Sequence, residues 1–262
     1  MKQQIPNCFT LSNLFLGATA ILYILQPGLT YHADGDGLVT IPENMMVASW
    51  LIFAAALVDF LDGFVARWMN QCSEMGKQLD SLADVVSFGV APGLMVLQFL
   101  RFSYASTEGG LDISMAFLLP ALLIPCAGAY RLARFNLDQS KSTGFKGIPI
   151  PAAGILIASF PLVNWYATDA WVLDLLLSKW LWYSLIIVLC VGMVSTVPML
   201  ALKFSGLSFK KILPFLIILA IALPVALLFG ALPVALLFGW LAISAGFIAY
   251  VILSLLFKPT ES

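Results

Sequence analysis

Eight apolar stretches of 18 to 25 residues follow one another along the chain. A transmembrane helix needs about 20 such residues. Because 61% of the 262 residues are hydrophobic and only 10% are charged, a soluble globular enzyme is excluded. We predict an all-α integral membrane protein, a bundle of about eight transmembrane helices. The predicted spans lie near 9–26, 46–68, 79–100, 113–135, 150–167, 179–201, 212–230 and 232–256, so six helices form a unit at 1–200 and a C-terminal pair occupies 201–262.

The cations predict the orientation of these spans, because short cytoplasmic loops carry an excess of Lys and Arg. Eight spans place both termini on one side of the membrane. Eleven of the 13 Lys and Arg residues fall on that side, and only Arg101 and Lys179 fall on the other. We therefore expect the termini and the 67–78 and 135–149 loops to face the cytoplasm.

Net charge and cysteines restrict the partners. The formal net charge is −1, so nucleic acid is not an expected partner. The four cysteines form no CxxC pair and the chain has one histidine, which argues against a disulfide framework or a thiolate zinc site.

Four aspartates break the apolar pattern within one hairpin. Asp59 and Asp62 lie at the end of the second predicted span, and Asp80 and Asp84 lie at the start of the third. A charged side chain at the centre of a bilayer costs roughly 2.5–3.5 kcal/mol on insertion scales. On helices, Asp59, Gly63 and Arg67 share one stripe, and Gly76, Asp80 and Asp84 share another, so the hairpin brings the two stripes together. The simpler alternative is that these acids lie in the membrane interface and pair with Arg67 and Lys77.

A divalent cation would relieve the repulsion among four converging carboxylates. Oxygen ligands select hard ions, so we expect Mg²⁺ or Mn²⁺, as one ion or two, or Ca²⁺ in a looser site. Arg67 supplies a planar donor for phosphate oxygens, and the glycines leave room for a ligand near the backbone. The residues thus predict a metal-assisted phosphate site that faces the cytoplasm. A cation or proton pathway of a transporter is the alternative from another class, but its acids should be spread over several depths.

The segment 59–84 reads D-x2-D-G-x2-A-R-x8-G-x3-D-x3-D and resembles the signature of the CDP-alcohol phosphatidyltransferase family at every fixed position. PNCFTLSN at 6–13, DSLADVVSFGVAP at 80–92, RLARFN at 131–136 and KGIPIPAA at 146–153 resemble the phosphatidylserine synthase branch. The resemblance covers about residues 6–153. It implies an enzyme of the inner membrane, with its active site open to the cytoplasm, that transfers a phosphatidyl group from CDP-diacylglycerol to L-serine and releases CMP. Glycerol 3-phosphate and inositol phosphate are the alternative acceptors, and a homodimer is also implied.

The resemblance also implies residue roles. Asp59, Asp62 and Asp80 would be metal ligands, and Asp84 would be a ligand or neighbour of the metal and the general base. The residues that would line the CDP pocket are Gly63, Ala66, Arg67 and Gly76.

Two further polar groups have open roles. Arg131, Arg134 and Asn136 would hold the lipid phosphate or the serine carboxylate, or they are a positive-inside stop. Asn7, Thr10 and Asn13 share a face of the first span, where they cap either the nucleotide end of the pocket or the helix itself.

Overall fold

The computed structural model describes residues 4–26, 30–31, 39–40, 43–68, 73–107, 112–137, 145–166, 170–196 and 198–199. The α-helices are α1 (Gln4–Leu25), α2 (Glu43–Trp68), α3 (Glu74–Asp84), α4 (Ala91–Ala105), α5 (Leu123–Leu137), α6 (Ile150–Tyr166), α7 (Ala170–Leu176) and α8 (Lys179–Val194). A π-helical segment, η1 (Val85–Val90), joins α3 to α4, and two 3₁₀ segments, Met115–Phe117 and Leu119–Leu122, precede α5. Two antiparallel pairs of two-residue strands complete the described structure: β1 (Thr30–Tyr31) with β2 (Val39–Thr40), and β3 (Phe145–Lys146) with β4 (Pro198–Met199).

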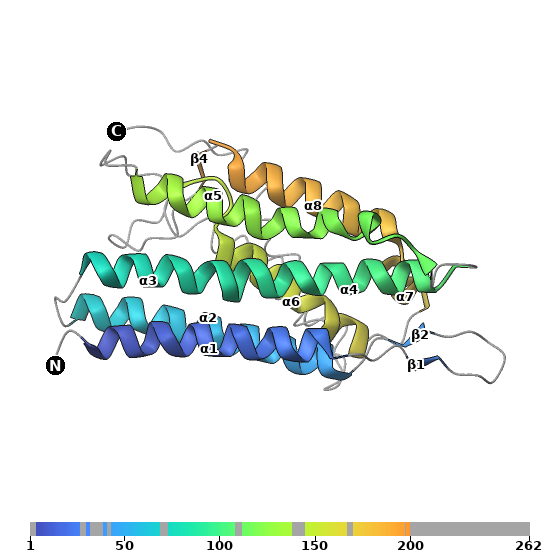
Figure 1. The fold of residues 1–262 in the computed structure, drawn as a ribbon, viewed down its shortest axis with the longest axis horizontal. Helices are drawn as coiled ribbons and strands as arrows, with labels where there is room; N and C mark the ends of the chain where they lie inside the picture. The colour runs from blue at the N-terminus through green and yellow to red at the C-terminus, as the bar shows by residue number, and fades with distance from the viewer. Residues whose placement is uncertain are drawn as a thin grey trace, which may run out of the picture.

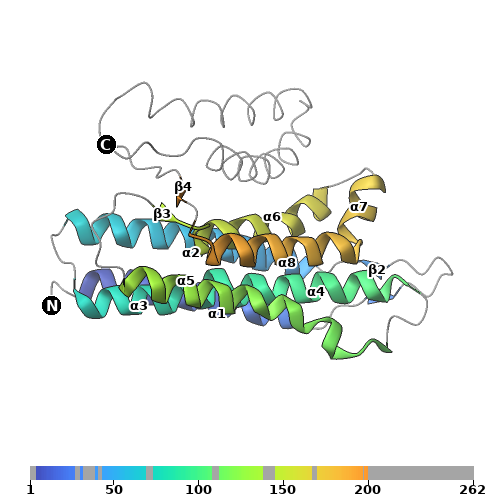
Figure 2. The ribbon, with the colours of Figure 1, turned by 90° about the horizontal axis from the view of Figure 1, so that it is seen from above.

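The helices form an elongated bundle around one long central helix (Figure 1). α3, η1 and α4 continue directly into one another along the whole length of the bundle. α1 and α2 pack side by side on one flank, and α5 and α8 pack together on the other. Figure 2, which is turned by 90°, shows α6 on the same side as α2 and α8. The central helix therefore contacts elements from both halves of the described chain.

Three helices in the described part are long and apolar enough to cross a membrane. They are Asn7–Leu25, Glu43–Gly63 and Glu74–Ala105, and shorter apolar helices occupy Ile150–Trp165 and Lys179–Val194. The helical class is confirmed, and these segments are those of an integral membrane protein. Six of the eight predicted stretches contain helix, whereas 212–230 and 232–256 lie outside the described residues. The count of eight spans and the division at residue 200 therefore stay predictions.

The stretch predicted as one span at 113–135 has a different structure. It begins with the 3₁₀ segments, and regular α-helix starts only at Leu123. Pro120 and Pro125 cannot donate backbone hydrogen bonds, so a regular helix cannot run through both positions without losing bonds. Pro125 is tolerated because it lies in the first turn of α5, where backbone N–H groups need no helical partner.

The stretch predicted at 179–201 ends early, at Val194. Beyond it, β4 pairs with β3, which leads into Gly147. Gly147 has a φ of +71°, and a Cβ there would lie 2.7 Å from the Met193 carbonyl oxygen. The Ile148 N–H donates to the Gly192 carbonyl at 3.0 Å. The segment before α6 thus passes close to the end of α8, and glycine permits that approach.

α1 buries a face of mostly small and polar residues and exposes a face of large apolar ones. Thr10, Asn13, Gly17, Ala20 and Ile24 form the buried face, and Leu11, Phe15, Leu22 and Leu25 are exposed. A Cβ on Gly17 would lie 2.2 Å from Ser87 Oγ and 2.7 Å from Ser87 Cα. Small residues at such crossings let helices approach closely in membranes. The exposed apolar face is suited to lipid, and the buried face fixes α1 against η1.

Candidate metal and phosphate site

The four aspartates converge where the end of α2 meets α3. One carboxylate oxygen from each of Asp59, Asp62 and Asp80 lies within 4.8 Å of the other two. The Asp84 carboxyl group lies within interaction range of all three. Asp62 and Asp84 are each only 7% exposed. The structure thus brings the four aspartates of the two predicted stripes together.

Two oxygens of this cluster lack hydrogen-bond partners in the described structure. Asp80 Oδ1 and Asp84 Oδ1 are buried and accept no hydrogen bond. Buried carboxylate oxygens without partners are costly, and neighbouring carboxylates repel one another. A cluster of three to four carboxylates with free oxygens is the donor set that Mg²⁺ and Mn²⁺ prefer. The residues therefore fit a divalent cation.

α1 contacts the cluster through Thr10. Its Oγ1 donates a hydrogen bond of 2.7 Å to Asp62 Oδ2, although the two residues are 52 positions apart in the chain. This hydrogen bond helps to fix the orientation of the Asp62 carboxylate. In metal sites, outer contacts of this kind orient the ligands, and the loss of one typically costs about 10–100-fold in metal affinity or activity.

The glycines of the predicted CDP pocket differ in what the structure shows of them. Gly76 lies in the first turn of α3, where its N–H donates to Ser73 Oγ at 2.9 Å. A Cβ at Gly76 would lie 3.0 Å from Ser73 Oγ, which is tight, and at an ordinary contact distance of 3.4 Å from Asn7 Oδ1 on α1. Gly63 follows Asp62 on α2 and is partly buried. The side chains of Ala66 and Arg67 lie outside the described residues, so their role in binding stays a prediction.

The three residues of the second predicted cluster, Arg131, Arg134 and Asn136, all lie on α5 but have different surroundings. Arg131 is on the buried face of α5 and is 5% exposed. Asn136 Nδ2 donates to Ser81 Oγ at 2.8 Å, which ties α5 to the residue directly after Asp80. Arg134 instead donates to the carbonyl oxygens of Val194 and Ser195, at 2.7 and 2.9 Å. Its guanidinium therefore caps the end of α8.

Sequence reasoning did not identify the partners of these side chains. Ser81 occupies a variable position of the motif, and nothing in the sequence marks it as the partner of Asn136. The π-helical segment directly after Asp84 was also not predicted. π-Helical turns are rare and occur frequently at functional sites.

The fold and the site define a class: a membrane protein in which a cluster of aspartates lies at the junction of two long helices. A model of the CDP-alcohol phosphatidyltransferase family matches residues 3–180. The chain belongs to the CDP-alcohol phosphatidyltransferase family.

Curated relatives carry more specific names. The chain is 37% identical over 161 residues to a CDP-diacylglycerol–serine O-phosphatidyltransferase of Helicobacter pylori, a match that covers 61% of this chain and 57% of the relative. It is 35% identical over 158 residues to a protein of the same name from Bacillus subtilis, covering 60% of this chain and 75% of the relative. An archaetidylserine synthase of Methanothermobacter thermautotrophicus is 36% identical over 132 residues, covering 50% of this chain and 52% of the relative. The chain thus spans little more than half the length of two of these relatives.

Proposed function

We propose that the chain transfers the phosphatidyl group of CDP-diacylglycerol to the hydroxyl group of L-serine, giving phosphatidylserine and CMP. The observation that carries this proposal is the cluster formed by Asp59, Asp62, Asp80 and Asp84 within the matched family region. The names of the relatives from Helicobacter pylori and Bacillus subtilis support serine as the acceptor.

The cluster divides into ligands and a base. Asp59, Asp62 and Asp80 would hold Mg²⁺ or Mn²⁺, as one ion or two, and Asp84 would be a further ligand or a neighbour of the metal as well as the base. When bound, such an ion polarises the diphosphate and neutralises the charge that develops on CMP. The Thr10 hydroxyl keeps Asp62 in a fixed orientation by its hydrogen bond.

Asp84 is suited to act as the general base because its Oδ1 is buried and accepts no hydrogen bond from the described residues. In the proposed step the serine hydroxyl oxygen forms a bond to the phosphorus of the phosphatidyl group. The bond from that phosphorus to the CMP oxygen breaks, and the hydroxyl proton goes to Asp84. A direct attack with inversion at phosphorus requires no covalent enzyme intermediate.

The remaining roles belong to the nucleotide and the lipid. Gly63, Ala66, Arg67 and Gly76 would line the CDP pocket. Arg131, Arg134 and Asn136 would face the lipid phosphate or serine. Arg134 caps the end of α8, whereas Asn136 contacts Ser81, the residue directly after Asp80, and so lies nearer to the aspartates.

The decisive experiment measures CMP release by the purified full chain with CDP-diacylglycerol in mixed micelles and an acceptor panel. Serine should support turnover far above glycerol 3-phosphate and inositol phosphate, and a chelator should abolish it until Mn²⁺ or Mg²⁺ is restored. Turnover with another acceptor alone would refute serine. Full activity in excess chelator would refute the metal mechanism.

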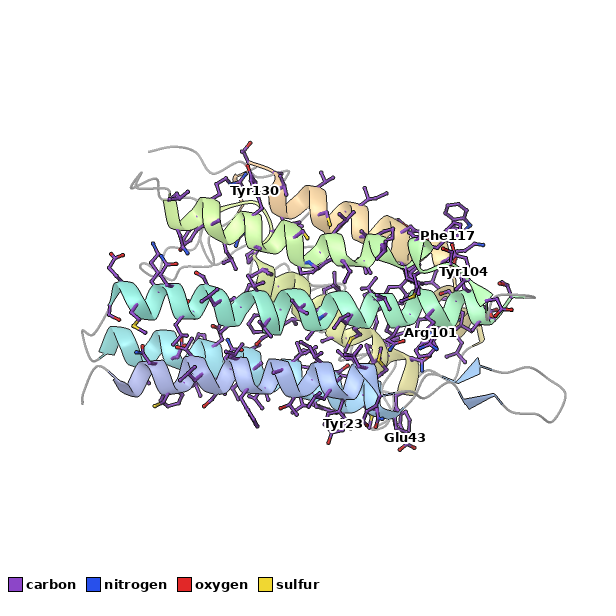
Figure 3. The ribbon with its side chains drawn as sticks, viewed as in Figure 1. Tyr23, Glu43, Arg101, Tyr104, Phe117 and Tyr130 are labelled. Carbon is purple, nitrogen blue, oxygen red and sulfur yellow. The ribbon has the colours of Figure 1, made fainter. Side chains whose placement is uncertain are left out.

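We also propose that the site faces the cytoplasm. Figure 3 shows Arg101, Tyr104 and Glu43 at the end of the bundle opposite the start of α3. Labels on cysteines introduced at Asp36 or Thr107 should react from outside intact cells, and those at Ser140 or Ser208 should not. The reverse pattern would invert the orientation.

A homodimer, which the family resemblance implies, is tested by light scattering of the purified protein.

A further inference from the structure

Asn13 is a buried polar side chain that has no role in the reaction proposed above, although its sequence position is compatible with the nucleotide end of the pocket or with a helix cap. It lies on α1, is 0% exposed, and neither its Oδ1 nor its Nδ2 has a hydrogen-bond partner within the part of the chain that the structure describes. An amide buried in this way costs free energy that a purely structural position would not retain. Buried polar groups without partners in a native structure therefore point to a ligand that the structure does not contain.

The position of Asn13 relates it to the carboxylate cluster. It follows Thr10, which bonds Asp62, by three residues, so both lie on the same face of α1. Its backbone carbonyl accepts a 3.0 Å hydrogen bond from Ser87 Oγ, and Ser87 follows Asp84 by three residues. With a rise of about 1.5 Å per residue, Asn13 lies about one helical turn beyond the cluster, toward the middle of the bundle.

The backbone around Asn13 is held firmly. Ser87 belongs to the π-helical segment Val85–Val90 and packs directly on Gly17, where no Cβ would fit. The hydrogen bond from Ser87 occupies the carbonyl of Asn13 and leaves its side-chain amide available. The amide is thus presented at a fixed place next to the turn that follows Asp84.

We propose that the Asn13 side chain binds the acceptor molecule and positions its hydroxyl for Asp84. This inference rests on the proposed function and adds an acceptor-binding residue to it. The side-chain amide of asparagine has an oxygen that accepts hydrogen bonds and an NH₂ group that donates two. An amino-acid substrate such as serine likewise carries both hydrogen-bond donors and hydrogen-bond acceptors. The ester groups of a diacylglycerol only accept hydrogen bonds and would leave Asn13 Oδ1 without a partner.

The test compares Asn13→Leu and Asn13→Ala with Gln98→Leu in the purified full chain. Gln98 is a matched control because it is also a buried amide packed against α1, but its Nε2 donates to the Ile24 carbonyl at 2.8 Å. The rate of CMP release is measured as a function of serine concentration at saturating CDP-diacylglycerol. It is then measured as a function of CDP-diacylglycerol concentration at saturating serine. Thermal stability is measured without substrates.

The Asn13 variants should raise KM for serine by about tenfold or more, the effect of losing about 1.4 kcal/mol of binding. KM for CDP-diacylglycerol and the Mn²⁺ concentration for half-maximal activity should change far less. Their melting temperature should not fall, because the Asn13 side chain makes no hydrogen bond to the described residues that the substitution could remove. Gln98→Leu should lower the melting temperature and leave KM for serine unchanged.

An unchanged KM for serine in both Asn13 variants would overturn the inference and assign the amide to a water molecule. A KM for CDP-diacylglycerol that rises instead would assign it to the donor lipid and also overturn the inference. If wild-type protein uses another hydroxyl acceptor, serine fails as the substrate, and the same comparison with that acceptor decides the role of Asn13. A wild-type chain that uses no acceptor would overturn both proposals.

Discussion

Replacing Thr10 with valine tests whether α1 is part of the metal site. The substitution removes Oγ1, which donates a 2.7 Å hydrogen bond to Asp62 Oδ2, and keeps the β-branched shape of the side chain. Asp62 is 7% exposed, so little water is available to replace the lost donor. A hydrogen bond to a charged group is worth about 1.5–3 kcal/mol. Loss of an outer-sphere partner of this kind typically costs about 10–100-fold in metal affinity or activity.

We therefore expect Thr10→Val to raise the Mn²⁺ concentration for half-maximal CMP release by about 10–100-fold. Saturating Mn²⁺ should restore most of kcat, because the aspartates themselves remain. The assay is a Mn²⁺ titration of CMP release at fixed, saturating CDP-diacylglycerol and serine. Thr10→Ser retains the hydroxyl and should stay close to wild type.

Thr19→Val is the matched control on the same helix. Thr19 Oγ1 donates to the Phe15 carbonyl within α1, at 2.8 Å, and is remote from the aspartates. The control should leave the Mn²⁺ titration unchanged. Equal shifts in the Thr10 and Thr19 variants, or no shift in Thr10→Val, would refute the view that Thr10 orients a metal ligand.

Three further variants test other parts of the site. In saturating Mn²⁺, Asp84→Asn should lower turnover by about 10²–10⁴-fold and change the affinity for CDP-diacylglycerol far less. If the affinity falls as much as turnover, Asp84 is chiefly a metal ligand. Arg134→Gln should lower the free energy of unfolding by about 1–3 kcal/mol, because it removes the cap of α8, and should leave KM for serine nearly unchanged. A rise in KM for serine without a loss of stability would instead assign Arg134 to substrate binding. Gly17→Ala should lower the free energy of unfolding by about 1–3 kcal/mol, because the new Cβ would lie 2.7 Å from Ser87 Cα. A higher melting temperature would contradict the close contact between Gly17 and Ser87.

The carboxylate cluster could be predicted from the sequence because its four aspartates lie within one short segment of the chain. Asp59 and Asp62 lie on one helix, and Asp80 and Asp84 lie on the next, so helical periodicity and one hairpin suffice to bring them together. The apolar stretches were predictable for the same reason, since hydropathy is a property of each segment alone.

The contacts between distant segments could not be predicted in this way. Thr10 and Asp62 are 52 positions apart, and Arg134 bonds carbonyls that lie 60 and 61 positions away. The charge of Arg134 is equally compatible with a phosphate ligand and with a helix C-terminus, because both present oxygen acceptors. Only the packing of α5 against α8 shows which acceptors are within its reach.

α1 joins the two halves of the carboxylate hairpin from a third side. Thr10 contacts Asp62 on α2, while Asn13 and Gly17 contact Ser87 just beyond Asp84. Each contact lies about one turn of α1 from the next, so a displacement of this helix would change both sides of the cluster at once. Small and polar residues on this face allow the close approach that short hydrogen bonds require. The first helix therefore supports the chemistry of the site, although all four aspartates lie on other helices.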